Sequence, residues 1–358
     1  HTHLPLWSLL VPLLAVGLLS MSSWLLGNAV GITVLSAVLM VSVMAAVHHA
    51  ELVAHKVGEP LGTLVLALAV TVIEVALIVA MMMAGGQQAA AVPRDTVLAA
   101  IMIICTGVVG LCLLIGGVRH REQSFRVEGA SAGLSALIAM ATLSLVLPTF
   151  TTTTKGGTYS VSQLAFAGLA SLALWLVFVF VQTVRHRGYF LPVDGAADEN
   201  VHAPKPGTAQ TWAAVALLLV SLVAVIGLAK VLSPAIEQGV ARVGAPKSVI
   251  GVIIAMLVLL PETVAAMRAA YANRLQTSLN LAIGSALASI GLTIPVVAGV
   301  AVWMGLPLQL GIDGKDLVLL VLTFSVNTLT MALGRTTVMQ GAVHLVIFAA
   351  FLFLSLVP

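Results

Sequence analysis

Long apolar stretches separated by short polar breaks follow one another along the whole chain. Most are about 18 residues or longer, the length at which an α-helix can cross a bilayer. Their hydrophobicity is nearly continuous, whereas membrane-spanning strands would give shorter, alternating segments. The breaks predict about eleven transmembrane helices, at residues 4–25, 28–49, 61–84, 95–117, 130–150, 161–185, 211–232, 246–270, 278–304, 315–334 and 339–357.

The composition of the 358-residue chain agrees with this pattern, because 60% of the residues are hydrophobic and 8% are charged. Soluble domains have about 25% charged residues, so the sequence predicts an all-α polytopic membrane protein whose main partner is the lipid bilayer. The net charge of +3 comes from basic residues scattered singly between apolar runs and implies no nucleic-acid partner. Cys105 and Cys112 share one helix face and are expected to be small core residues.

The longest polar insert, residues 185–210, divides the chain into two halves. Apart from the first span, five spans precede the insert and five follow it. Because this number is odd, two repeats would be inverted relative to each other. We therefore expect an extra first helix at 1–27, a first repeat at 28–184, a cytosolic linker at 185–210 and a second repeat at 211–358.

Basic residues in the loops predict the orientation. Of the 16 Lys and Arg residues, ten fall on the side of the N-terminus and six on the other. Cytosolic loops are enriched in these residues, so we expect a cytosolic N-terminus and an external C-terminus.

Two glutamates interrupt spans that are otherwise apolar. Glu74 lies in the second span of the first half and Glu262 in the second span of the second half. A carboxylate inside the bilayer is costly, and an isolated one would simply take up a proton. In inverted repeats the two helices run antiparallel and can cross near the midplane, where paired carboxylates would hold protons or a metal cation. The pair therefore predicts a site for cation and proton exchange.

Further oxygen ligands are predicted near these glutamates. Pro261 removes an N–H from its helix, which frees the carbonyl of Leu257 for a cation or merely kinks the helix. Hydroxyl groups on neighbouring turns and spans either ligate the cation or serve helix packing. These candidates are Thr71, Thr106, Ser285 and Ser289.

The stretch HHAELVAHKVGEP, residues 48–60, is predicted to form a short interfacial helix on the cytosolic side. Histidine titrates near neutral pH, so this stretch is either a pH-sensing gate or a solvated connector. Its candidate residues are His49, Glu51, His55 and Glu59. His344, in the last span, lines an ion path or joins helices.

Several segments together resemble the cation/calcium exchanger superfamily, most closely the bacterial calcium/proton antiporters of the ChaA type. They are HAELVAHKVGEPLGTLVLALAVTVIEVALIVAMM, LLPETVAAM, LAIGSALASIGLTIPVV and GRTTVMQGAVHLVIFAAFL. The resemblance implies that Glu74 and Glu262 bind cations and protons, and that the repeats move to alternate access. Well-known relatives carry Gly-Asn-Ala-x-Glu around each glutamate, whereas Thr71 and Leu259 stand at the asparagine positions here.

We therefore expect a proton-coupled antiporter in a bacterial inner membrane that exports Ca²⁺ from the cytosol. Fewer protein oxygens than in those relatives make Na⁺ or K⁺ exchange the alternative, since Ca²⁺ takes six to eight oxygen ligands. A passive cation channel is the rival from another class. No cofactor fingerprint and no catalytic motif favours an enzyme, and the sequence leaves the oligomeric state open.

Overall fold

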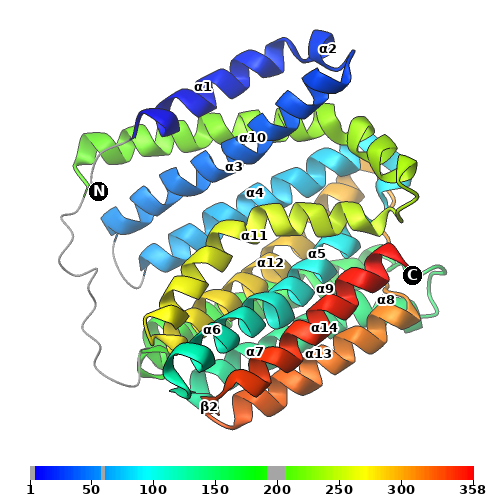
Figure 1. Cartoon of the computed structure of the whole chain (residues 1–358). Coiled ribbons are helices and arrows are strands. Elements are labelled where there is room, and N and C mark those ends of the chain that lie inside the picture. The colour runs from blue at the N-terminus through cyan, green and yellow to red at the C-terminus, as the bar shows by residue number, and fades with distance from the viewer. Residues whose placement is uncertain (1–4, 58–60, 192–205) are drawn as a thin grey trace. The chain divides into compact units, whose positions relative to one another are not determined.

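The computed structural model describes residues 5–57, 61–191 and 206–358 and is almost entirely helical there (Figure 1). The α-helices are α1 (Leu6–Ser20), α2 (Ser22–Leu25), α3 (Ala29–Val57), α4 (Leu61–Gly85), α5 (Val92–Met102), α6 (Val109–His120), α7 (Val127–Ala141), α8 (Leu147–Phe150), α9 (Val161–Phe180), α10 (Thr208–Arg242), α11 (Ser248–Tyr271), α12 (Leu275–Met304), α13 (Gly314–Ala332) and α14 (Val338–Leu356).

Shorter elements join or extend these helices. The 3₁₀ turns are η1 (Gly86–Ala89) and η5 (Arg187–Phe190), and the strands are β1 (Gln123–Ser124) and β2 (Arg335–Thr336). Three π-helical turns, in which the helix is locally wider, lie within longer helical runs. They are η2 (Ile103–Val108), η3 (Thr142–Val146) and η4 (Val181–Arg185).

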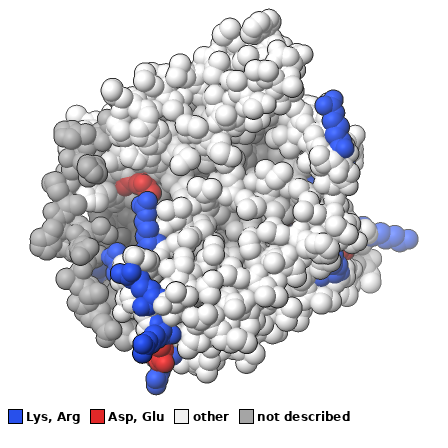
Figure 2. All heavy atoms as spheres, in the orientation of Figure 1, with Lys and Arg blue, Asp and Glu red and all other residues white. Residues whose placement is uncertain are grey.

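Within the described part of the chain, ten helical runs are long and apolar enough to cross a membrane. Large apolar side chains also face outward, among them Trp303 at 85%, Leu169 at 67% and Phe166 at 65% exposure. Figure 2 shows that most of the visible face is neither acidic nor basic. Apolar surface of this extent suits contact with lipid. The prediction of an all-α, multi-pass membrane protein is confirmed.

Two local predictions were wrong. The first predicted span, 4–25, breaks at Met21 into α1 and the one-turn α2, and α1 has only 15 residues. Residues 48–57 of the predicted separate helix at 48–60 are the C-terminal part of α3, which runs unbroken to Val57, and residues 58–60 lie outside the described residues. No Gly or Pro occurs between residues 32 and 57, so nothing in the sequence ends the helix earlier.

The helices form two compact units. Unit 1 contains α1 to α4 and α10, and unit 2 contains α5 to α9 and α11 to α14. Each half of the sequence therefore contributes helices to both units. In unit 1, α10 packs along α3, so the first spans of the two halves lie side by side (Figure 1).

A proline determines how α1 is joined to α3 in unit 1. Pro12 lies inside α1 and has no N–H to offer the carbonyl of Ser8, four residues earlier. The fully buried imidazole of His49 on α3 lies with its Nε2 2.9 Å from that carbonyl oxygen. Since a carbonyl only accepts, Nε2 carries the proton and donates. The missing intrahelical bond is thus replaced by a bond between helices.

Unit 2 contains two matching loop contacts. Before α7, the N–H of Phe125 donates to the carbonyl of Gly334, which follows α13, at 3.0 Å. Before α13, the N–H of Gly311 donates to the carbonyl of Gly157, which follows α8, at 2.8 Å. Both accepting glycines have positive φ, +65° and +69°. Each half therefore bonds the entrance of its fourth span to the exit of the other half's fourth span, as inverted repeats would do.

Candidate functional site

In unit 2, a glutamate and a serine meet beside a small pocket. The hydroxyl of Ser285 on α12 donates to Oε2 of Glu262 on α11 at 2.6 Å. That distance is typical of an O–H···O⁻ bond to a carboxylate. The pocket has room for about one water-sized occupant. Its lining residues are Ile104, Val108, Leu259, Glu262, Thr263, Ala282 and Ser285.

The local sequence explains how Glu262 is placed. Pro261 lies inside α11, so the carbonyl of Leu257 lacks the N–H that would normally bond to it. Thr263 turns its hydroxyl back to the carbonyl of Leu259 at 2.7 Å. On α12, the facing residues Ala282 and Ser285 are small, and this leaves the space beside the carboxylate. The structure thus gives a direct contact between two members of the predicted ligand set, Glu262 and Ser285.

Thr106 and Ser289, two other predicted oxygen ligands in unit 2, are buried but are not among the residues that line the pocket. Thr106 lies in the π-turn η2 and its hydroxyl donates within the helix to the carbonyl of Met102. Ser289, one turn beyond Ser285 on α12, is 1% exposed. Ile104 and Val108, from the same π-turn as Thr106, form the pocket wall opposite α11 and α12. Sequence reasoning missed these two residues, because nothing in an apolar run marks them.

Glu74 belongs to unit 1. It lies near the middle of α4 and only 2% of the residue is exposed. Val70, Ile73 and Leu77, on adjacent turns of the same helix, are also buried. Thr71 is 4% exposed and its hydroxyl donates to the carbonyl of Ala67 at 2.8 Å, so its oxygen lone pairs remain available for a ligand.

The histidines and acidic residues predicted as a gate are spread over different environments. His49 is buried against α1, whereas Glu51 is exposed and His55 is partly exposed near the end of α3. Glu59 lies outside the described residues. His344, on α14 in unit 2, is fully buried and contacts Thr330 and the carbonyl of Cys105.

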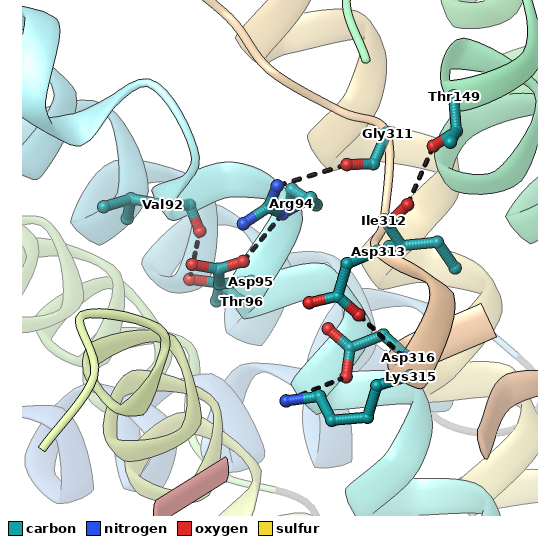
Figure 3. Close-up of polar contacts among 10 residues, drawn as sticks. All are labelled: Val92, Arg94, Asp95, Thr96, Thr149, Gly311, Ile312, Asp313, Lys315 and Asp316. Carbon is teal, nitrogen blue, oxygen red and sulfur yellow. Dashed lines mark hydrogen bonds and ion pairs between the residues drawn. The ribbon is translucent and has the colours of Figure 1, made fainter. Parts of the chain in front are cut away.

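A charged cluster that the sequence did not suggest lies where α5 and α13 begin (Figure 3). Arg94 forms an ion pair of 2.8 Å with Asp95 and donates to the carbonyl of Gly311 at 3.1 Å. Asp313 caps α13 by accepting the N–H of Asp316 at 2.9 Å. In the sequence, the adjacent opposite charges of Arg94 and Asp95 near the start of a predicted helix could have indicated this cluster. Among the described residues, no group of three His, Cys, Asp or Glu side chains is arranged to hold a metal ion.

Comparison with known proteins places the chain in a family. The family model described as sodium/calcium exchanger protein matches residues 23–184 and 213–357. The y4hA protein of Sinorhizobium fredii is 49% identical over 99% of this chain and 97% of its own length. The sodium-potassium/proton antiporter ChaA of Escherichia coli is 35% identical over 96% of this chain and 94% of its own length.

Solved structures show the same fold. Native YfkE superposes with a TM-score of 0.73 and 18% identity, over 98% of this chain and all 100% of that one. The H⁺/Ca²⁺ exchanger CAX superposes with a TM-score of 0.69 and 15% identity, over 96% of this chain and 88% of that one. The chain therefore belongs to the sodium/calcium exchanger protein family, within the cation/calcium exchanger superfamily that its sequence resembles, and is a membrane cation antiporter of that family.

Proposed function

We propose that this protein exchanges Ca²⁺ for protons and exports Ca²⁺ from the cytosol by alternating access. The observation that carries the proposal is the hydrogen bond between Ser285 and Glu262, beside a pocket of about one water's size that α11, α12 and the π-turn η2 line. Carboxylate and hydroxyl oxygens suit hard cations. A proton on the same carboxylate removes the charge that attracts the cation. Each occupant therefore disfavours the other, which is the requirement for exchange.

We propose that Glu74 binds the cation and the proton in the first repeat, as Glu262 does in the second. It occupies the equivalent place in the second span of its half and is buried. We propose repeats at 28–184 and 211–358, an extra helix at 1–27 and a cytosolic linker at 185–210. The two segments that match the family model support this division, since they fall on either side of the linker. The carbonyl of Leu257 and the hydroxyls of Thr71, Thr106 and Ser289 complete the proposed ligand set.

The proposed setting is a bacterial inner membrane, with the N-terminus in the cytosol and the C-terminus in the periplasm, which requires α1 and α2 together to make an eleventh crossing in addition to the ten longer helical runs among the described residues. The bias of Lys and Arg toward one side supports this orientation. The proton gradient would then drive cations outward. In this orientation the end of α3 lies on the cytosolic side, where Glu51 and His55 are proposed to meet arriving cations, with Glu59, which lies outside the described residues, as a further candidate.

Exchange of Na⁺ or K⁺ for protons is the second candidate. The ChaA relative from Escherichia coli carries the name sodium-potassium/proton antiporter, and it aligns with nearly the whole chain. Thr71 and Leu259 supply no side-chain amide, so Ca²⁺ would need water or carbonyl oxygens to reach its usual six to eight ligands. A monovalent cation makes smaller demands on the protein.

Reconstituted protein tests the proposal. Proteoliposomes holding a pH-sensitive dye receive Ca²⁺, Na⁺ or K⁺ in turn, and proton release from the lumen or uptake into it is recorded. We expect Glu262→Gln to abolish cation-dependent proton movement. Glu237→Gln is the matched control, because Glu237 also lies on a membrane-spanning helix and contacts a serine, Ser233, at 3.5 Å. Wild-type proton movement in Glu262→Gln, or cation conduction without proton movement in the wild type, would contradict the proposal.

A further inference from the structure

The pocket wall opposite Glu262 belongs to the π-helical turn η2, which lies between α5 and α6 in the third span of the first half. Ile104 and Val108, near the two ends of this turn, line the pocket. A π-turn is less favourable than a regular helical turn and occurs mostly where tertiary contacts maintain it, often at functional sites. The shape of the pocket therefore depends on whatever holds this turn in place.

Two buried side chains from other helices meet at one carbonyl of the turn. Nδ2 of Asn327 on α13 donates to the carbonyl of Cys105 at 3.1 Å, and its second hydrogen goes to the carbonyl of Thr323 at 2.8 Å. Nδ1 of His344 on α14 lies 2.8 Å from the same carbonyl oxygen of Cys105. Cys105 stands between the two pocket-lining residues of η2, so both bonds act directly on the wall.

The partners of His344 define its tautomer. A carbonyl only accepts, so Nδ1 of the ring carries a proton and donates to Cys105. Nε2 then accepts from the hydroxyl of Thr330, 3.1 Å away. A neutral imidazole satisfies both contacts with no polar atom left over. With 0% exposure for His344, 2% for Asn327 and 3% for Thr330, water cannot substitute for any of these bonds.

Close helix packing keeps this arrangement rigid. Gly110, on α6 just beyond the π-turn, faces His344, and a Cβ there would lie 2.9 Å from the Cβ of the histidine. Only glycine allows α14 to approach closely enough for the ring to reach Cys105. The glycine and the histidine thus belong to one contact.

We propose that Asn327 and His344 are positioning residues, which hold the π-turn η2 so that Ile104 and Val108 shape the ion pocket beside Glu262. The inference rests on the proposed function for its effect on transport, but its structural part does not. Neither residue is among those that line the pocket. They act through the carbonyl of Cys105, and their loss alters how well the cation fits rather than whether a proton can be exchanged.

A pair of amide substitutions separates the two nitrogens of His344. Asn places an N–H near the position of Nδ1 and keeps the bond to Cys105, whereas Gln reaches the position of Nε2 and keeps only the contact with Thr330. We expect His344→Gln and Asn327→Leu to raise the KM for the transported cation by about threefold to tenfold, with a smaller change in maximal rate. His344→Asn should stay near the wild type. Ser355→Ala, a buried position on the same helix, is the control.

Hydrogen–deuterium exchange gives a second readout that needs no transport. Amides of Ile103–Val108 should exchange faster in His344→Gln and Asn327→Leu than in the wild type, and His344→Asn should preserve their protection. Equal behaviour of the Asn and Gln variants in both measurements would overturn the inference. If the wild type exchanges no cation for protons, the proposed function fails, and the exchange of these amides alone decides whether the positioning role stands.

Discussion

Replacing Ser285 by alanine removes a hydroxyl that donates to Glu262 beside the pocket. The bond measures 2.6 Å and its acceptor is a carboxylate, a class of hydrogen bond that contributes about 1.5 to 3 kcal/mol. A donor to the ionised carboxylate favours it over the protonated form, so at about 1.4 kcal/mol for each factor of ten its loss shifts the competition toward the proton and weakens apparent cation binding by roughly tenfold to a hundredfold. The same hydroxyl is a proposed cation ligand, so the cation-bound state loses an oxygen as well.

The assay for this prediction is cation-dependent proton movement in proteoliposomes, with the cation concentration varied to obtain KM and maximal rate. We expect Ser285→Ala to raise the KM strongly while transport at saturating cation persists. Thr293→Val is the control, because Thr293 lies on the same helix and its buried hydroxyl has no hydrogen-bond partner among the described residues. A KM for Ser285→Ala that matches the control would refute the proposed role of this hydroxyl.

Three further predictions concern stability in detergent, measured by thermal unfolding. Arg94→Gln should lower the free energy of unfolding by about 1 to 3 kcal/mol, because it leaves the carboxylate of Asp95 buried without its ion pair. Adding Asp95→Asn should recover part of this stability, and a double variant less stable than Arg94→Gln would argue against the pairing. His49→Phe should lower the free energy of unfolding by a similar amount, because it removes the donor to the Ser8 carbonyl, which has no intrahelical donor at Pro12. Adding Pro12→Ala should restore part of this stability, and an unchanged stability of His49→Phe would contradict the bond between His49 and Ser8. Burial raises the pKa of Tyr159 above its ordinary 10.0. The contribution of this residue to stability is therefore complete below about pH 10 and is lost as the pH rises through the raised pKa. Tyr159→Phe should lack this loss of stability at alkaline pH, and identical profiles of stability against pH in the two proteins would rule out the contribution.

The sequence predicted the parts of the fold that the bilayer itself requires. Helix positions follow from apolar length, and the limits of α4, α9 and α14 agree with the predicted spans within a few residues. The contact between Glu262 and Ser285 was also predictable, because a membrane carboxylate needs a polar neighbour and the next span offers small hydroxyl residues. Local rules of this kind depend on few distant contacts.

Features that depend on distant partners could not be predicted. The π-turn at 103–108 lies in an ordinary apolar run, and it is held by Asn327, 222 positions away in the chain. Likewise, Arg94 bonds to a carbonyl 217 positions away. His49 read as a titrating surface residue because it lies in a polar stretch, but the proline in α1 gives it a buried acceptor. In each case the deciding partner comes from another helix.

Coupling between cation and proton fluxes is the most direct test of the central claim. Wild-type protein is reconstituted with the membrane potential clamped, a pH gradient is imposed, and the flux of Ca²⁺, Na⁺ and K⁺ is measured together with luminal pH. We predict that at least one cation moves against the proton flow in a fixed ratio, and that reversing the pH gradient reverses its direction. A cation flux that does not depend on the pH gradient would indicate a passive pathway and would contradict exchange at Glu74 and Glu262.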